Sequence, residues 1–356
     1  MSELRNPATV KGVLAARMDR LAPAQKALLQ TLAVIGKEFP WSLVRQVAGQ
    51  PEDHLRHLLA GLQASDFIYE QPAIPEIEYA FKHALTQEVA GQAMLAEQRS
   101  ALHERTARAI EMLFRRQLKD HCSELAHHYS LSGNIAKAVE YLHCTGRQAL
   151  ERSAHPEAIQ HLGAALELLK RTPDTHERAR QELALRITLA PALLATKGYA
   201  SPEVEATYTR ALALCEQGGE TRQFFLAKLG LRTFFSLRAE HRMAYELGER
   251  LLALAESAND PGLLGQSHIV LGTSSFYLGE LGPARTHLDQ GVACFDLENH
   301  CADAFLLGQD PLVHGLIASG RALWFLGYPD QARRRMHEAL ALARSCLITP
   351  TAWRSA

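Results

Sequence analysis

The 356-residue sequence lacks the features that mark most metal proteins, redox proteins and membrane proteins. Its six cysteines are scattered and form no Cys-x-x-Cys pair, which excludes a zinc ribbon or a thioredoxin-type motif. Nowhere do about 18 apolar residues run together, and the N-terminus has no apolar signal segment, so we expect neither a transmembrane helix nor export. We therefore expect a cytoplasmic protein whose cysteines are free thiols rather than a disulfide framework.

The sequence also lacks an excess of either charge. Lys and Arg number 38 against 39 Asp and Glu, which gives a formal net charge of -1. Nucleic acids and anionic membranes both select a concentrated positive surface, so neither is expected as the main partner. A hydrophobic content of 47% with 22% charged residues excludes a disordered chain and is typical of folded protein.

Motifs for nucleotide binding and hydrolysis are missing too. Gly36-Lys37 superficially matches the end of a P-loop, but Thr31 stands where the first glycine is required and Glu38 where the magnesium-binding hydroxyl is required. Gly-x-Gly-x-x-Gly, His-Glu-x-x-His and Gly-x-Ser-x-Gly do not occur. We expect no catalytic residue, no cofactor and no enzymatic activity from this chain alone.

Histidine, in contrast, is frequent, with 17 copies. The candidate metal ligands form two groups, namely His121, Cys122, His127 and His128, and the pair His54 and His57. Zinc requires three or four converging ligands. Neighbouring residues on a helix point about 100° apart, so the first group spreads around the axis and no complete ligand set can be named. We predict no metal site and expect surface or interhelical histidines.

Residues 1–118 are predicted to form a small helical domain with a β-hairpin. Apolar spacing and helix-start signals predict four short helices, at 10–18, 28–35, 41–48 and 51–64. Two strand-like segments around a Pro-containing turn predict a hairpin over 67–81. This is the element order of a winged helix. Its expected recognition helix carries Glu52 and Asp53 against Arg56 alone, which favours protein packing over DNA binding.

Residues 119–356 contain degenerate repeats, of which we count about five or six. The offsets between small, turn and large residues recur in two places, at Gly272, Gly279, Ala284 and Leu288 and at Gly320, Gly327, Ala332 and Met336. The same offsets fit Ala126, Tyr129, Gly133, Ala138 and Leu142, and Val204 and Ala244 mark equivalent second-helix positions. The pattern resembles the tetratricopeptide repeat, a helix–turn–helix unit of about 34 residues. The predicted fold is therefore all-α, with a winged-helix domain followed by a TPR-like α-solenoid.

Residues 7–21 and 79–90 together resemble the winged-helix region of STAND-type signalling ATPases. The resemblance is to bacterial multidomain proteins that place an adenylate/guanylate cyclase domain before a predicted ATPase and tetratricopeptide repeats. Later matches, up to about residue 345, include residues 127–129, 137–142, 197–199 and 326–332. In related signalling ATPases a Met-His-Asp motif places its histidine near the β-phosphate of bound ADP. His83 matches that histidine, although Lys82 precedes it and Ala84 replaces the aspartate.

The resemblance implies that His83 senses the nucleotide state in a full-length relative, where ATP or ADP would be the cofactor. The competing interpretation is that His83 only caps or packs the start of a helix. Cyclase and ATPase domains would precede residue 1 and repeats would continue past Ala343, so we expect a chain truncated at its C-terminus.

The resulting hypothesis is a non-catalytic regulatory and protein-interaction module. Its partner would be another protein or an intramolecular ATPase or cyclase domain, and self-association through the last repeat is a further expectation. Two alternatives stay open: part of a nucleotide cyclase, and a fragment of a LuxR-type ATPase–TPR transcriptional regulator.

Overall fold

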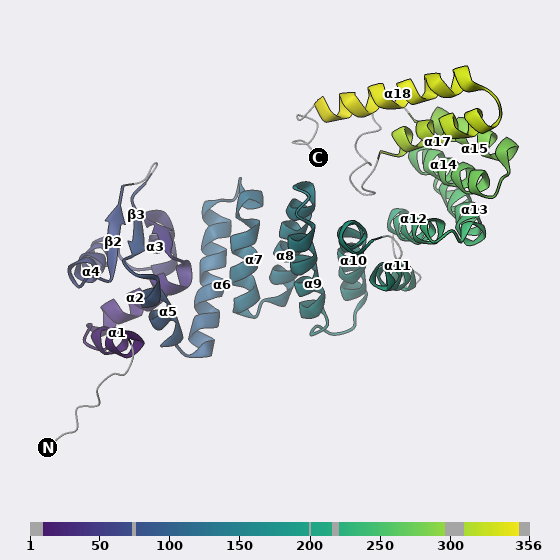
Figure 1. The fold of residues 1–356 in the computed structure, drawn as a ribbon. Helices are drawn as coiled ribbons and strands as arrows, with labels where there is room; N and C mark the ends of the chain where they lie inside the picture. The colour runs from purple at the N-terminus through teal and green to yellow at the C-terminus, as the bar shows by residue number, and fades with distance from the viewer. Residues whose placement is uncertain (1–9, 73–75, 199–200, 216–220, 296–309, 349–356) are drawn as a thin grey trace. The chain divides into compact units, whose positions relative to one another are not determined.

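The computed structural model describes residues 10–348 except 73–75, 199–200, 216–220 and 296–309 (Figure 1). The chain divides into two compact units, Met1–Thr145 and Gly146–Ala356, both built mainly from helices. Among the described residues, every helix is too short or too polar to cross a membrane. The predicted domain boundary after residue 118 stays a prediction, as does the C-terminal truncation, since residues 349–356 lie outside the described part.

The first unit begins with short helices around a small sheet. Its elements are α1 (Val10–Met18), α2 (Pro23–Ile35), β1 (Glu38–Pro40), α3 (Trp41–Ala48), α4 (Glu52–Ala64), β2 (Ile68–Gln71), β3 (Glu78–Phe81) and α5 (Ala84–Gln92). The predicted helices and the antiparallel β2–β3 hairpin are confirmed, with Ile68 opposite Phe81. The structure adds a strand that the sequence did not predict, because β1 pairs with β3 and gives the order β1-β3-β2.

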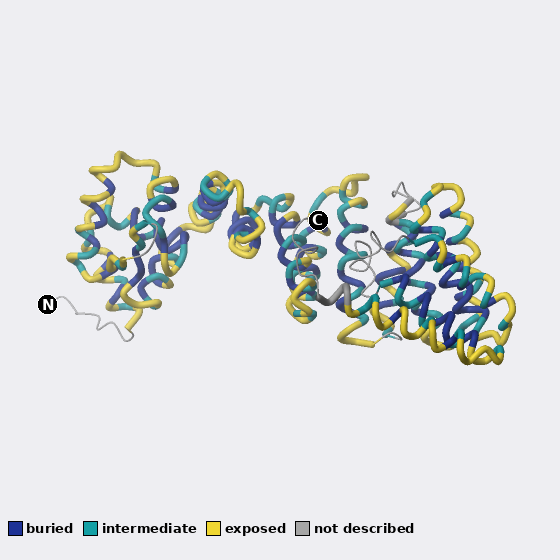
Figure 2. Tube along the Cα trace, turned by 90° about the horizontal axis from the view of Figure 1, so that it is seen from above, coloured by how far each residue is buried: buried dark blue, intermediate teal, exposed yellow. Residues whose placement is uncertain are grey.

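The aromatic residues of β1 and β3 explain why such a short strand forms. Phe39 is fully buried and its ring lies 6.4 Å from that of Tyr79 and 5.7 Å from that of Phe81. Buried leucine and valine residues of α2, α3 and α4 belong to the same small domain, and Figure 2 colours the buried positions of the chain dark blue. Burying each large apolar side chain contributes about 1.5–3 kcal/mol, so three residues of strand suffice.

Longer helices complete the first unit: α6 (Ala96–Leu113), the 3₁₀ turn η1 (Leu118–His121), α7 (Cys122–Ser132) and α8 (Ile135–Glu151), which continues past Thr145. One carboxylate ties three of them together. Glu111 on α6 accepts hydrogen bonds from the hydroxyls of Tyr129 (2.8 Å) and Tyr141 (2.6 Å), and Lys137 Nζ lies 3.2 Å away. The two tyrosine rings are stacked with centroids 5.6 Å apart. Burial raises the pKa of Glu111, but these hydrogen bonds outweigh it and leave that pKa below its ordinary value.

The second unit consists of helices packed in succession. They are α9 (His155–Leu169), α10 (His176–Lys197), α11 (Pro202–Cys215), α12 (Thr221–Leu237), α13 (His241–Ala258), α14 (Pro261–Tyr277), α15 (Leu281–Ala293), α17 (Pro311–Phe325) and α18 (Pro329–Ile348). α12 packs on α13, α14 on α15 and α17 on α18, which confirms TPR-like helix pairs. Asp260 and Asp310 cap α14 and α17 by accepting hydrogen bonds from the first backbone amides of each helix.

The small and turn residues of the repeats lie where the sequence predicts them. Gly279 and Gly327 each end a first helix with φ near +84°, a conformation that favours glycine. A side chain at Gly272 would meet the second helix, because a Cβ there would lie 2.9 Å from the Ala284 carbonyl and 2.6 Å from Leu288. Ala284 itself is fully buried at that crossing. Close helix crossings therefore explain the recurring small residues.

Candidate functional site

The nucleotide-sensor candidate, His83, lies between β3 and α5. It is the N-cap residue of α5, its backbone is extended, and its carbonyl accepts a hydrogen bond from the Thr86 amide at 2.9 Å. The side chain is exposed and makes no capping hydrogen bond. The structure therefore gives the imidazole no capping role, and its nucleotide-sensing role stays a prediction.

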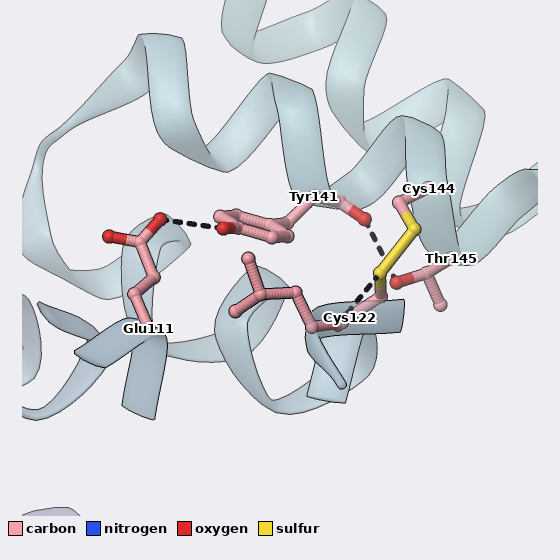
Figure 3. The surroundings of a disulfide bond; sticks show 6 residues. Glu111, Cys122, Tyr141, Cys144 and Thr145 are labelled. Atoms are coloured by element: carbon pink, nitrogen blue, oxygen red, sulfur yellow. Dashed lines mark hydrogen bonds between the residues drawn. A yellow bond between two sulfur atoms is a disulfide. The ribbon is translucent and has the colours of Figure 1, made fainter. Parts of the chain in front are cut away.

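The histidine–cysteine group of η1 and α7, His121, Cys122, His127 and His128, is not assembled around a common point. Cys122 forms a disulfide with Cys144 across α7 and α8, with Cα atoms 6.1 Å apart (Figure 3). The expectation that all cysteines are free thiols is therefore wrong for this pair. Sequence inspection missed it because the partners are 22 positions apart and meet only when α7 and α8 fold back on each other. Among the described residues, no three His, Cys, Asp or Glu side chains are arranged to hold a metal ion.

His128 instead pairs with His103 of α6, a residue that the sequence did not single out. Their Nδ1 atoms are 2.9 Å apart in a buried contact, so one ring must donate and the other must accept through an unprotonated Nδ1. Burial lowers the pKa of His103 to about 4 and that of His128 to about 3. In the second unit His268 and His287 form a similar pair at 3.1 Å. The abundant histidines thus serve, in part, as interhelical contacts.

The surface contributed by the first helices of the last three pairs is distinctive in charge. α12, α14 and α17 contain no Asp or Glu from their first to their last residue, and we call their set the first-helix row. The row carries Arg222, Lys228, Arg232 and Arg321. Carboxylates of the same pairs lie on the second helices, for example Glu246 and Asp289. The near-zero net charge of the chain therefore conceals a segregation of charge between helices.

Arg232 is the most unusual member of the first-helix row. Its side chain is 4% exposed, and its Nη2 donates to the Val270 carbonyl and to Ser274 Oγ, both at 2.8 Å. Its Nε has no hydrogen-bond partner, and no carboxylate of the described residues forms an ion pair with the guanidinium. Burial lowers the pKa of Arg232 to about 10, which leaves it charged at neutral pH. An isolated buried charge is costly.

Two further groups of α17 belong to the same region. Burial, and then the positive fields of Arg232 and Arg321, lower the pKa of His314 to about 4. Arg321 Nη1 lies 3.4 Å from the Tyr277 hydroxyl, while its buried Nε lacks a partner. Tyr277 is half-exposed and stacks on His241 at 4.8 Å. Sequence reasoning named none of these residues, although the absence of acids from three successive first helices was a usable signal.

No family model matches the chain. A curated relative, the uncharacterized protein R02095 of Rhizobium meliloti (strain 1021), is 25% identical over 340 residues, which cover 92% of this chain and 32% of the relative. The chain thus spans about a third of the length of that relative. A Rap protein complexed with Competence and Sporulation Factor is 16% identical, covers 75% of this chain and 72% of its own, and has a TM-score of 0.49. A STAND protein with a tetratricopeptide repeat sensor from Pyrococcus horikoshii is 11% identical over 96% of this chain and 54% of its own, with a TM-score of 0.43.

Proposed function

We propose that the chain is a non-catalytic regulatory module whose TPR-like repeats bind an acidic segment of a partner protein. The first-helix row carries this proposal, because its three helices contain no Asp or Glu and the Nε of its Arg321 has no hydrogen-bond partner. Arg321 lies nearer the surface and offers a planar guanidinium suited to bidentate binding of a carboxylate. The exposed rings of Tyr277 and Phe325 add apolar contact area beside it.

The head of the first unit is proposed to be a winged helix that passes the binding event to a neighbouring domain. The order of helices and strands from α2 to β3 supports this interpretation. On α4, Arg56 hydrogen-bonds Glu52 at 2.8 Å and lies 4.6 Å over the Trp41 ring, so the helix offers no uncommitted cation for DNA. This favours protein packing.

The neighbouring domain is proposed to be an ATPase of the STAND type, in a cytoplasmic signalling protein that also carries a cyclase. The sequence resemblance of residues 7–21 and 79–90 supports this context. The exposed imidazole of His83 is available to a nucleotide held by such a domain, which would supply ATP or ADP. Membership of a nucleotide cyclase concerns the whole protein in this proposal, and the chain itself supplies regulation.

A peptide-display selection on the immobilised full chain tests the interaction proposal. Selected peptides should be rich in Asp and Glu, and their affinity should fall about tenfold or more, equal to 1.4 kcal/mol, in Arg321→Ala. The matched control is Arg108→Ala on α6, an exposed arginine of the first unit that should leave affinity unchanged. Peptides without acidic enrichment, or equal binding to Arg321→Ala, would contradict the proposal. Turnover of ATP to ADP or to a cyclic nucleotide by this chain alone would refute its non-catalytic character.

A further inference from the structure

The histidine pair of the second unit differs from that of the first in its access to water. His268 lies in the middle of α14 and His287 in the middle of α15, and their Nδ1 atoms are 3.1 Å apart. Both side chains are partly exposed, whereas His103 and His128 are buried. A hydrated ion can therefore reach the pair of the second unit but not that of the first.

The separation of the two nitrogens matches that of two ligands of one metal ion. Imidazole nitrogens bind zinc at about 2.0–2.1 Å. Two such bonds place the nitrogens about 2.9 Å apart at a right angle and about 3.3 Å apart at the tetrahedral angle. The observed 3.1 Å lies between these values. Rotation of the two rings about their side-chain bonds, without movement of the helices, brings both lone pairs onto one ion.

Close helix crossings on both sides of the pair hold the two backbones in place. One turn before His268, a Cβ at Gly265 would lie 3.1 Å from the carbonyl oxygen of Gly291 on α15. One turn after it, a Cβ at Gly272 would lie 2.9 Å from the carbonyl oxygen of Ala284. The helices that carry the two imidazoles are therefore already in contact, and a cation does not have to bring them together.

A carboxylate near the pair favours a cation. Glu256 on α13 is exposed and lies close enough to His268 for its charge to raise the pKa of that histidine. Burial outweighs this effect in His268 and also lowers the pKa of His287. Both imidazoles are therefore neutral at pH 7, which is the form that binds a metal ion.

We infer that His268 and His287 form a binding site for a divalent transition cation, such as Ni²⁺ or Zn²⁺, between α14 and α15. The proton between the two Nδ1 atoms moves to Nε2 of the donor ring, which frees both Nδ1 lone pairs without a change of net charge. No third side chain in the described part of the chain completes the ligand set, so water fills the remaining positions and Glu256 attracts the ion from outside. Although α14 belongs to the first-helix row, none of these three residues takes part in the proposed binding of an acidic segment.

Nickel(II) is the probe, because cysteine thiolates compete less strongly for it than for zinc. Calorimetric titration of the tag-free full chain, stripped of metal, should show one tight site per chain. His268→Asn and His287→Asn should each weaken this site at least tenfold, because even the loss of an outer partner lowers metal affinity about 10–100-fold. Glu256→Gln should weaken it about tenfold. Mg²⁺ should not bind, since it requires oxygen ligands.

The matched control is the double variant His54→Ala, His57→Ala, which removes an exposed histidine pair from α4 and should leave the tight site unchanged. Circular dichroism checks that the Asn variants keep their helix content, as expected for partly exposed residues. Saturating nickel should raise the melting temperature of the second unit in the wild-type chain and in the control, but not in His268→Asn. Absence of a tight site in the wild-type chain, or its survival in either Asn variant, would overturn the inference. An unchanged affinity in Glu256→Gln would overturn the role assigned to Glu256.

Discussion

Replacing Glu111 should uncouple the three helices that meet at its carboxylate. Glu111→Gln keeps the side-chain size but leaves only one oxygen to accept from Tyr129 and Tyr141, which are 2% and 5% exposed. A hydrogen bond to a charged group contributes about 1.5–3 kcal/mol, and leaving one partner unsatisfied costs a similar amount. The Glu111 side chain keeps 24% exposure to water, which can satisfy part of what the substitution removes. We therefore expect Glu111→Gln to lower the free energy of unfolding by an amount near the lower limit, about 1.5 kcal/mol.

Glu111→Ala should lower the free energy of unfolding of the first unit by more, about 3 kcal/mol, because both tyrosine hydroxyls lose their acceptor. Unfolding in urea needs a probe confined to the first unit, since a chain of two units need not unfold in one step. Replacing Trp324 and Trp353 by Phe leaves Trp41 on α3 as the fluorescent reporter of that unit. The midpoint shift at constant slope then gives the change in the free energy of unfolding.

A double-mutant cycle with Tyr141→Phe decides whether the network acts as a unit. Residues in direct contact are expected to show a coupling energy of about 0.5 kcal/mol or more. The pKa of Glu111 lies below its ordinary value, so its stabilising effect is complete above the ordinary carboxyl pKa and is lost as pH falls through the lowered value. Glu111→Gln should therefore remove part of the acid sensitivity of the first unit. Additive effects of the two substitutions, with unchanged acid sensitivity, would refute this reasoning.

Three further predictions concern groups buried between helices. Thiol titration of the unfolded chain should find two fewer reactive thiols before reduction than after it, and Cys122→Ser should abolish the difference. Opening this loop should destabilise the first unit by about 3 kcal/mol, as measured by its urea midpoint. Both histidines of the pair His103–His128 have lowered pKa values, so the unfolded chain gains protons that the folded pair excludes. Stability should fall as pH drops from about 6.5 toward about 4. In the double variant His103→Asn, His128→Asn, thermal melts over this pH range should show a smaller dependence of melting temperature on pH. Arg232→Met should raise the melting temperature of the second unit, because it removes an unpaired buried charge. Its acceptors stay satisfied, since Ser274 Oγ also donates to the Val270 carbonyl, and a lower melting temperature would contradict this account.

Much of the fold was accessible from the sequence because its signals are local or periodic. Turn glycines such as Gly279, and small crossing residues such as Ala284, recur at fixed offsets and predicted the helix pairs. Strand β1 was missed because three residues ending in Pro40 carry no alternation, and pairing with β3 alone makes them a strand. The Cys122–Cys144 bond was missed for a related reason, since it depends on a crossing and not on local spacing.

The candidate site was less predictable, because burial and partner identity are properties of the packed helices. His83 was chosen from a sequence resemblance, and the structure adds that its side chain is exposed and does not cap α5. Arg232 looks in the sequence like an ordinary surface residue of an amphipathic helix. Only the packing of α12 against neighbouring helices reveals that its guanidinium is buried without an ion-pair partner in the described part of the chain.

The separation of charge between helices also refines the argument from net charge. A total of -1 argues against nucleic acid or an anionic membrane as the main partner, yet a sum over the whole chain says nothing about one face. The first-helix row is cationic, but its central charge, Arg232, is buried beside apolar and hydroxyl groups rather than spread along a basic surface. A nucleic acid would require many exposed cations and would give a steep salt dependence. A single carboxylate bound by Arg321 needs only one or two cations, so binding of an acidic segment through this row should depend only weakly on salt.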